Sequence, residues 1–459
     1  MDYATHLRRI TVLGLPLIGS HLSQFAIQLT DTVMLGRYDI EVLAAQVLAA
    51  TFFFILLIFG SGFGWAVMPL VAEAAARGDE TVVRRATRMA LWLTGGFALA
   101  CLPLLLGAGP ILRALGQAPA LSQMAADYLW IQGWSIVPAL GIMVLKSTLA
   151  GIERTQVVLW ATVAAVVVNA LANYALIFGN WGAPELGIRG AAIASLVSTA
   201  LSCAVMVAYT ARAMAAYAVF ANFWRVDRAI LARVFRLGLP IGLTSVAEVS
   251  LFSASSVMMG WLGAIPLAAH GIALNITSAV FMVHIGLSNV ATIRAGNALG
   301  RGDGPDLRRG ARAVVAVSLV FALVCVALFL LLPRPMIAAF LDPADPAYGQ
   351  VMRLAVAMLA AAALFQLVDA LQVMALGLLR GVQDTQVPML LAVISYWVVG
   401  VPVAYLLGFA LGLGGIGVWL GLAAGLAVAG VLMMRRFTAQ GAYVVERSKG
   451  SDGYPTPTR

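Results

Sequence analysis

Two acidic residues stand out in the middle of long apolar stretches. Glu248 lies near the centre of the stretch 231–260, and Asp369 lies within the stretch 350–378. A carboxylate at the depth of the bilayer centre costs roughly 2.5–3.5 kcal/mol on insertion scales, which makes both residues functional candidates. Without an opposing charge, two such carboxyl groups can take up a proton or bind a hard cation such as Na⁺ through their oxygens. The alternative is that each is a protonated, hydrogen-bonded structural acid.

A second polar set lies in the first half of the chain and consists of Asp31, Asn169 and Asn173. The two asparagines are four residues apart and therefore share one face of a helix. Together the three side chains could hold a cation or relay a proton. The alternative is that they join helices by hydrogen bonds, which contribute only ~0.6 kcal/mol each on average in membrane bundles.

Prolines and aromatic residues add weaker candidates. Pro16 and Pro240 lie inside apolar stretches, where a missing backbone N–H bends a helix and creates a possible hinge. Such bends are also common in membrane bundles without any hinge role. Five further residues could line a substrate cavity through polar, aromatic or thioether contacts, although aromatic and methionine residues in membrane helices more often face lipid or core: Gln24, Phe252, Phe281, Met282 and Tyr396.

The composition indicates the class of protein in which these residues lie. The 459 residues are 62% hydrophobic and 11% charged, against about 25% charged in soluble domains. The apolar runs are long and continuous rather than alternating, which excludes a β-barrel and predicts an all-α polytopic membrane protein. The net charge of +9 reflects arginines in cytoplasmic loops, so we expect the lipid bilayer and no nucleic acid as partner. Three cysteines in apolar runs imply no disulfide framework.

Hydropathy predicts twelve transmembrane helices. Arginine-rich segments fall at alternate ends of them, so the positive-inside rule places both termini and the loops at Arg77 and Arg301 in the cytoplasm. The predicted spans cover residues 10–36, 42–72, 86–108, 122–150, 155–178, 186–212, 231–260, 266–298, 311–333, 350–378, 386–410 and 413–435.

The two halves of the chain repeat each other. Residues 14–16 and 238–240 both read Gly-Leu-Pro, an offset of 224 (238 − 14), and the same offset relates Arg-Gly-Asp at 77–79 to 301–303. Later the offset is 230, as between Gly151 and Gly381. Six spans per half make this a parallel repeat, with a substrate path expected between the halves. We predict an N-lobe over 1–212, a cytoplasmic linker over 213–230, a C-lobe over 231–438 and a disordered cytoplasmic tail over 439–459.

The repeat also shows that the halves differ. Glu248 corresponds to Gln24 (248 − 224), and Asp369 corresponds to Ala139 (369 − 230), so only the second half has two deep acids. Neither an ATP-binding P-loop nor a metalloprotease or paired-cysteine motif occurs in the chain. We therefore expect no enzyme and no cofactor, but transport driven by an ion gradient of H⁺ or Na⁺.

Several motifs together resemble those of the multidrug and toxic compound extrusion (MATE) family, in its bacterial NorM-type branch. The resemblance covers residues 8–438 and rests on Pro16 with Asp31-Thr32-Val33-Met34-Leu35-Gly36, on Glu248, on Val168-Asn169 with Leu171-x-Asn173-Tyr174, on Asp369-Ala370-Leu371-Gln372, and on Gly377-x-Leu379-Arg380-Gly381-x-x-Asp384-Thr385.

This resemblance implies two pseudo-symmetric six-helix lobes and export of small cationic amphiphiles, by alternating access between the lobes, in exchange for H⁺ or Na⁺. It places the cation-coupling site at the helices of Glu248 and Asp369, with Na⁺ as a possible metal there, and a second site at Asp31, Asn169 and Asn173. The family pattern also has a tyrosine four residues before the aspartate, where this chain has Phe365. The lost hydroxyl favours H⁺ slightly over Na⁺, because Na⁺ needs several oxygen ligands.

The same resemblance implies a functional monomer in the bacterial cytoplasmic (inner) membrane. The runner-up is a flippase for a lipid-linked precursor, from the same superfamily, but that function needs a basic central cavity. A receptor or structural membrane protein is the third reading, and it would explain neither the repeat nor the deep acids.

Overall fold

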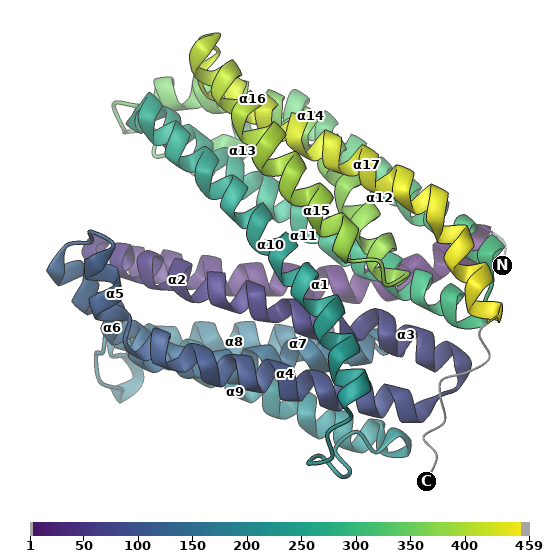
Figure 1. Ribbon diagram of the computed structural model, residues 1–459. Helices are drawn as coiled ribbons and strands as arrows, with labels where there is room; N and C mark the ends of the chain where they lie inside the picture. Colours follow the sequence, from purple (N-terminus) through teal and green to yellow (C-terminus); the bar gives the residue numbers. More distant parts are fainter. Residues whose placement is uncertain (1–2, 451–459) are drawn as a thin grey trace. The chain divides into compact units, whose positions relative to one another are not determined.

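The computed structural model describes residues 3–450, with side chains to residue 439. Long helices joined by short connections make up nearly all of this range, and no strand occurs within it (Figure 1). Twelve helical segments are long and apolar enough to span a membrane, and they lie where the hydropathy predicted spans. The all-α fold with twelve membrane helices is thus confirmed.

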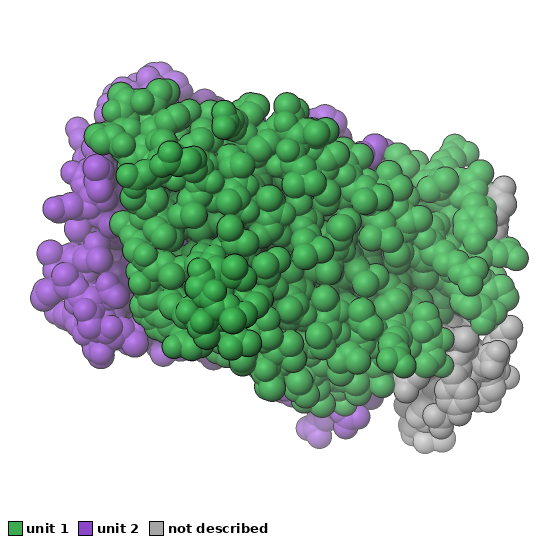
Figure 2. All heavy atoms as spheres, turned by 90° about the horizontal axis from the view of Figure 1, so that it is seen from above, with its two compact units in different colours: residues 1–14, 243–459 green, residues 15–242 purple. Residues whose placement is uncertain are grey.

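The helices fall into two compact units, unit 1 with residues 1–14 and 243–459 and unit 2 with residues 15–242 (Figure 2). Two helices contribute to both units, α1 (Tyr3–Tyr38) and α10 (Arg228–Leu262). The remaining helices of unit 2 are α2 (Ile40–Trp65), α3 (Val67–Arg77), α4 (Glu80–Leu106), α5 (Ala108–Ala114), α6 (Pro119–Gln132), α7 (Ile136–Gly151), α8 (Gln156–Phe178) and α9 (Ile188–Ala213). Those of unit 1 are α11 (Ala264–Arg301), α12 (Gly304–Leu331), α13 (Pro333–Ala338), α14 (Tyr348–Gly381), α15 (Gln386–Val393), α16 (Val401–Tyr405) and α17 (Gly414–Gly450).

The division between the units passes through α1 and α10 close to their prolines. Pro16 is the second residue after the break at Gly14, and Pro240 is two residues before the break at Gly242. The predicted lobes, 1–212 and 231–438, instead gave each of these helices entirely to one lobe. The start of each helix thus packs with the other half of the sequence, an exchange that hydropathy alone could not show.

Polar contacts of buried and half-buried side chains hold the start of each helix in its unit. In unit 1, His6 Nε2 lies 3.3 Å from Asp306 Oδ1, and the Arg294 guanidinium lies 3.0 Å from His6 Nδ1. In unit 2, the Arg233 guanidinium donates to Glu73 Oε2 at 3.0 Å. The His6–Asp306 and Arg233–Glu73 contacts join residues 300 and 160 positions apart in the chain, and they favour this assignment of the two helix starts.

The sequence repeat has the same local geometry in both halves. Gly78 and Gly302 end α3 and α11 with φ of 74° and 63°, in the left-handed region that glycine adopts without strain. Asp79 and Asp303 then cap the next helix by accepting a hydrogen bond from the backbone N–H three residues later. The duplication is therefore structural as well as sequential.

The predicted linker contacts α4, and the predicted disordered tail begins as helix. Within the predicted linker 213–230, residues 221–223 are held against α4, because Arg88 donates to the carbonyls of Ala221 and Asn222 and the indole of Trp92 donates to that of Phe223. Helix α17 continues to Gly450, so the predicted disordered tail is helical between residues 439 and 450. The rest of that tail, 451–459, lies outside the described residues.

A wide helical segment lies in the eleventh span. Residues Ile394–Gly400 and Leu406–Ala410 form π-helical turns on either side of Pro402. Proline donates no backbone hydrogen bond, and a wider turn is one way to accommodate the missing donor. Tyr396 lies in the first of these turns and is thereby positioned inside unit 1.

Candidate cation-coupling site

Helices α10 and α14 bring Glu248 and Asp369 into electrostatic range of each other. Asp369 is completely buried, and its two carboxylate oxygens accept no hydrogen bond from the residues described. Glu248 Oε1 is likewise buried without a donor in the part of the chain that the structure covers. A buried carboxyl group in this state needs a proton or a cation, because burying an unpaired charge is strongly unfavourable.

One basic side chain approaches this pair. Arg380, at the end of α14, interacts electrostatically with Glu248. The sequence interpretation named no cation near the two acids, and Arg380 is the cationic side chain whose charge acts on Glu248. Arg380 is eleven residues beyond Asp369 on the same helix, beyond the end of the predicted span 350–378, so the sequence interpretation assigned it to a loop.

Phe365 contributes an aromatic wall to the site. Its ring packs edge-on against Phe252, with centroids 5.9 Å apart, and against Trp419, with centroids 5.4 Å apart. The side chain is 3% exposed, so the position that carries a hydroxyl in the family pattern is occupied here by packed apolar rings. The predicted site residue therefore lies one turn before Asp369 on α14, but its side chain supplies no ligand atom.

A polar face of α14 continues from Asp369 in both directions. Gln366, Asp369 and Gln372 are three residues apart and are all completely buried. Their spacing puts them on neighbouring turns of one helix face. The Gln372 amide donates to the Tyr396 hydroxyl at 2.7 Å. Sequence reasoning named Gln372 only as part of a motif, and the buried contact with the eleventh span gives it a place in the site.

The predicted residues of unit 2 form a bonded cluster. Asn173 donates to Asp31 Oδ1 at 2.5 Å and to Asn169 Oδ1 at 3.1 Å. Ser195, on α9, donates to Asp31 Oδ2 at 3.1 Å. All four side chains are at most 6% exposed. Sequence reasoning missed Ser195, since one serine in a span rich in serine and alanine gives no signal of its own.

The two acidic sites differ in how their oxygens are used. Both oxygens of Asp31 accept hydrogen bonds from neutral donors, whereas neither oxygen of Asp369 does so from any described residue. Hydrogen bonds to a carboxylate stabilise its charged form. Asp31 therefore suits a structural or relay role, and Asp369 suits uptake of a positive charge.

The residues predicted to line a substrate cavity are divided between the units. Gln24 belongs to unit 2, whereas Phe252, Phe281, Met282 and Tyr396 belong to unit 1. The first four are partly exposed. Tyr396 is completely buried and bonded to Gln372, so its place is inside the helix packing rather than on a cavity wall.

Unit 2 has an open hollow of about 710 Å³. Helix α1 contributes Leu29, Thr30, Val33, Met34 and Arg37 to its lining, and the α8 end contributes Tyr174, Phe178 and Asn180. Asp31 lies between these α1 residues in sequence, but its side chain points to Asn173 and Ser195 instead. The hollow has the size and the mixed apolar character of a site for a small organic molecule.

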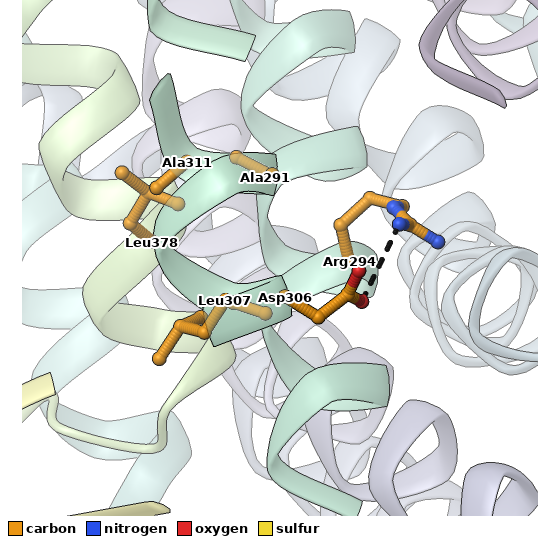
Figure 3. Close-up of a pocket in the computed structure, with 8 residues that line it drawn as sticks. Ala291, Arg294, Asp306, Leu307, Ala311 and Leu378 are labelled. Carbon is orange, nitrogen blue, oxygen red and sulfur yellow. Dashed lines mark ion pairs between the residues drawn. The ribbon is translucent and has the colours of Figure 1, made fainter. Parts of the chain in front are cut away.

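Two further buried cations lie away from the acids. Figure 3 shows Arg294 directed at Asp306, 3.7 Å away, in a crevice of unit 1 that has no room for a ligand. Asp306 also pairs with Arg301 at 2.7 Å. Lys146, in unit 2, is 3% exposed and interacts electrostatically with His21. Arg294 therefore belongs to the ion pairs that hold the start of α1, not to a binding cavity.

Comparison with known proteins agrees with the motifs. The family model MatE matches residues 16–175 and 240–406. A protein named "Probable multidrug resistance protein NorM" from Rhizobium meliloti is 44% identical over 95% of this chain and 94% of its own length. A protein of the same name from Agrobacterium fabrum is 43% identical over the same shares.

Solved structures share the fold. The crystal structure of a MATE P26A mutant has a TM-score of 0.87 at 19% identity and covers 97% of both chains. An outward-facing multidrug resistance MATE transporter has a TM-score of 0.86 at 19% identity and covers 96% of both chains. With more than two thirds of the sequence matched by the family model and by relatives above 40% identity, the chain belongs to the MATE family and to its NorM-type branch.

Proposed function

We propose that the chain is a secondary active antiporter that exports small cationic amphiphiles in exchange for H⁺ or Na⁺. One observation carries the proposal: Asp369 is completely buried, next to Glu248, with both carboxylate oxygens lacking a donor among the described side and main chains. Such oxygens bind a positive charge or a proton when one is present. The relatives' name, multidrug resistance protein, fits this substrate class.

Antiport follows if the ion and the drug favour different conformations. A ligand shifts a conformational equilibrium only by its differential affinity for the two states. A proton or Na⁺ on Glu248 and Asp369 removes the cost of their buried charge, and thereby stabilises the state in which both are enclosed. The drug must bind the other state better, whether or not it contacts the same acids.

Pro16 and Pro240 are the proposed hinges of this change. Each lies within two residues of the point at which its helix passes from one unit to the other. A proline leaves one helical hydrogen bond unmade, so bending there costs less than in an intact helix. Alternating access then requires bending at two positions, while each unit keeps its own packing.

The proposal includes a place and an orientation. The chain is a multi-pass membrane protein with twelve candidate spans. We propose the bacterial inner membrane, with both termini cytoplasmic, from the arginine-rich ends of alternate spans. We also propose that a single chain is the functional transporter and that it carries out no enzymatic reaction, because each acidic site is assembled within one chain.

Everted membrane vesicles test the function directly. With the protein present, a fluorescent lipophilic cation should accumulate in the vesicles when a proton or a Na⁺ gradient of the correct direction is imposed. Asp369→Asn, at equal abundance in the membrane, should abolish this accumulation. Absence of gradient-driven dye movement together with translocation of a lipid-linked anionic precursor would establish the flippase instead.

A further inference from the structure

The cation-coupling site contains a hydroxyl at a position that the sequence did not indicate. The family pattern expects it four residues before Asp369, where Phe365 packs against aromatic rings. In the structure, the Tyr396 hydroxyl comes from another segment, the eleventh span, and is hydrogen-bonded to Gln372, which lies one turn beyond Asp369 on α14. The hydroxyl that Phe365 lacks on α14 thus has a counterpart in Tyr396 on the eleventh span.

The hydrogen bond with Gln372 leaves the Tyr396 hydroxyl free to act toward the acids. The Gln372 amide nitrogen is the donor, at 2.7 Å, so the tyrosine oxygen is the acceptor and its O–H proton is available to another group. The other end of the amide, Gln372 Oε1, is buried without a donor among the residues described. Gln372 and Tyr396 therefore bring two neutral oxygens to the buried face of α14 that carries Asp369.

The backbone explains why Tyr396 occupies this place. It lies in the π-helical turn Ile394–Gly400, which changes the direction in which its side chain leaves the helix compared with regular α-helix. Gly400 lets this segment approach α17 closely, since a Cβ there would lie 3.3 Å from Gly425 Cα. Wide turns of this kind occur frequently at functional sites.

We propose that Tyr396, held by Gln372, is the hydroxyl residue of the cation-coupling site and sets its affinity for the coupling ion. This inference rests on the proposed antiport function. For Na⁺, Tyr396 Oη and Gln372 Oε1 would raise the number of oxygen ligands beyond the two carboxyl groups. For H⁺, the Tyr396 O–H would donate to whichever acid is ionised and make loss of the proton easier.

The test is the ion dependence of dye transport by Tyr396→Phe in proteoliposomes containing the full chain. Initial rates are measured against Na⁺ at fixed pH and against pH at fixed Na⁺, and dye binding is measured without any gradient. We expect the half-saturating concentration of the coupling ion to change at least about tenfold, with dye binding unchanged. Tyr405→Phe is the matched control, because Tyr405 lies on the same span with 53% of its surface exposed.

Each outcome decides the matter. Wild-type transport that depends on neither ion would overturn the proposed function itself. Ion-dependent wild-type transport with an unchanged midpoint in Tyr396→Phe would overturn this inference and leave the function standing, and a change in dye binding alone would make Tyr396 a substrate residue. Should Tyr396→Phe not fold, Gln372→Leu, which releases the hydroxyl, must shift the ion midpoint, and an unchanged midpoint there would equally refute the inference.

Discussion

The side chain of Asn173 donates a hydrogen bond to Asp31 at 2.5 Å, although 142 residues separate the two in the chain. This contact joins α8 to α1 within unit 2 and satisfies an acid that would otherwise be costly at bilayer depth. No comparable donor among the described residues reaches Asp369 in unit 1. The buried acid is therefore hydrogen-bonded in the first half of the duplicated chain, whereas the buried acid of the second half has no donor among the described residues.

Asp31→Asn should therefore impair transport only partly, and unequally for different dyes. The substitution removes a charge that Asn173 and Ser195 stabilise, and hydrogen bonds to charged groups contribute about 1.5–3 kcal/mol each. We expect a lower thermal midpoint of the purified protein and efflux that remains for some dyes. Asn275→Ala, outside both the cluster and the lining of the hollow, is the control. Complete loss for every dye with an unchanged midpoint would show that Asp31 is itself the coupling acid.

Much of this architecture was predictable from the sequence. Twelve apolar stretches gave the twelve spans because a membrane helix must be continuous and apolar to satisfy its own backbone in lipid. Polar residues in apolar stretches of the first half grouped Asp31, Asn169 and Asn173 into one set, and the structure joins them by hydrogen bonds. Site roles remain predictions, because contact alone does not establish transport.

Other features depend on long-range packing that no local pattern encodes. The start of α1 lies in unit 1 because His6 meets Asp306 and Arg294, residues almost 300 positions away. Arg380 acts electrostatically on Glu248, although the two residues are 132 positions apart in the chain. Tyr396 looked like a cavity residue because aromatic residues often line cavities, and only the wide turn around it revealed a buried position.

The topology makes a prediction about labelling. In a variant without its three cysteines, single cysteines in place of Arg77 or Arg301 should react with a membrane-impermeant thiol reagent only after the cells are opened. Cysteines in place of Arg113 or Arg334, at the opposite ends of their spans, should react in intact cells. The reverse pattern at Arg77 and Arg301 would invert the proposed orientation.

The hinge assignment predicts a kinetic effect. Pro16→Ala and Pro240→Ala restore a backbone donor within the two helices shared by the units, and should stiffen them. We expect initial efflux rates to fall severalfold while the protein still folds and binds dye. Pro103→Ala in α4, a helix that lies wholly in unit 2, is the matched control. An equal loss of rate in the control would mean that the prolines act through stability, not through bending.

Close helix packing in unit 1 predicts that one glycine substitution lowers the stability of the fold, independently of Glu248 and Asp369. A Cβ on Gly421 would overlap the backbone of Ala404, whereas one on Gly271 would meet open space. Gly421→Ala should therefore destabilise unit 1 by about 1–3 kcal/mol, as expected for overpacking. Gly271→Ala should leave the thermal midpoint of the detergent-solubilised protein nearly unchanged. Equal midpoints for the two variants would contradict the close approach of α16 and α17.

The central claim is that Asp369 and Glu248 couple ion movement to drug movement. Addition of a cationic dye to proteoliposomes with wild-type protein should release H⁺ or Na⁺, followed by an ion-sensitive fluorophore, and the flux should disappear in Asp369→Asn and nearly so in Glu248→Gln. Asp342→Asn, in an exposed loop, should behave as wild type. Strict Na⁺ dependence at fixed pH would identify Na⁺ and refute the initial preference for H⁺. Dye-induced ion movement that persisted undiminished in Asp369→Asn would contradict the account.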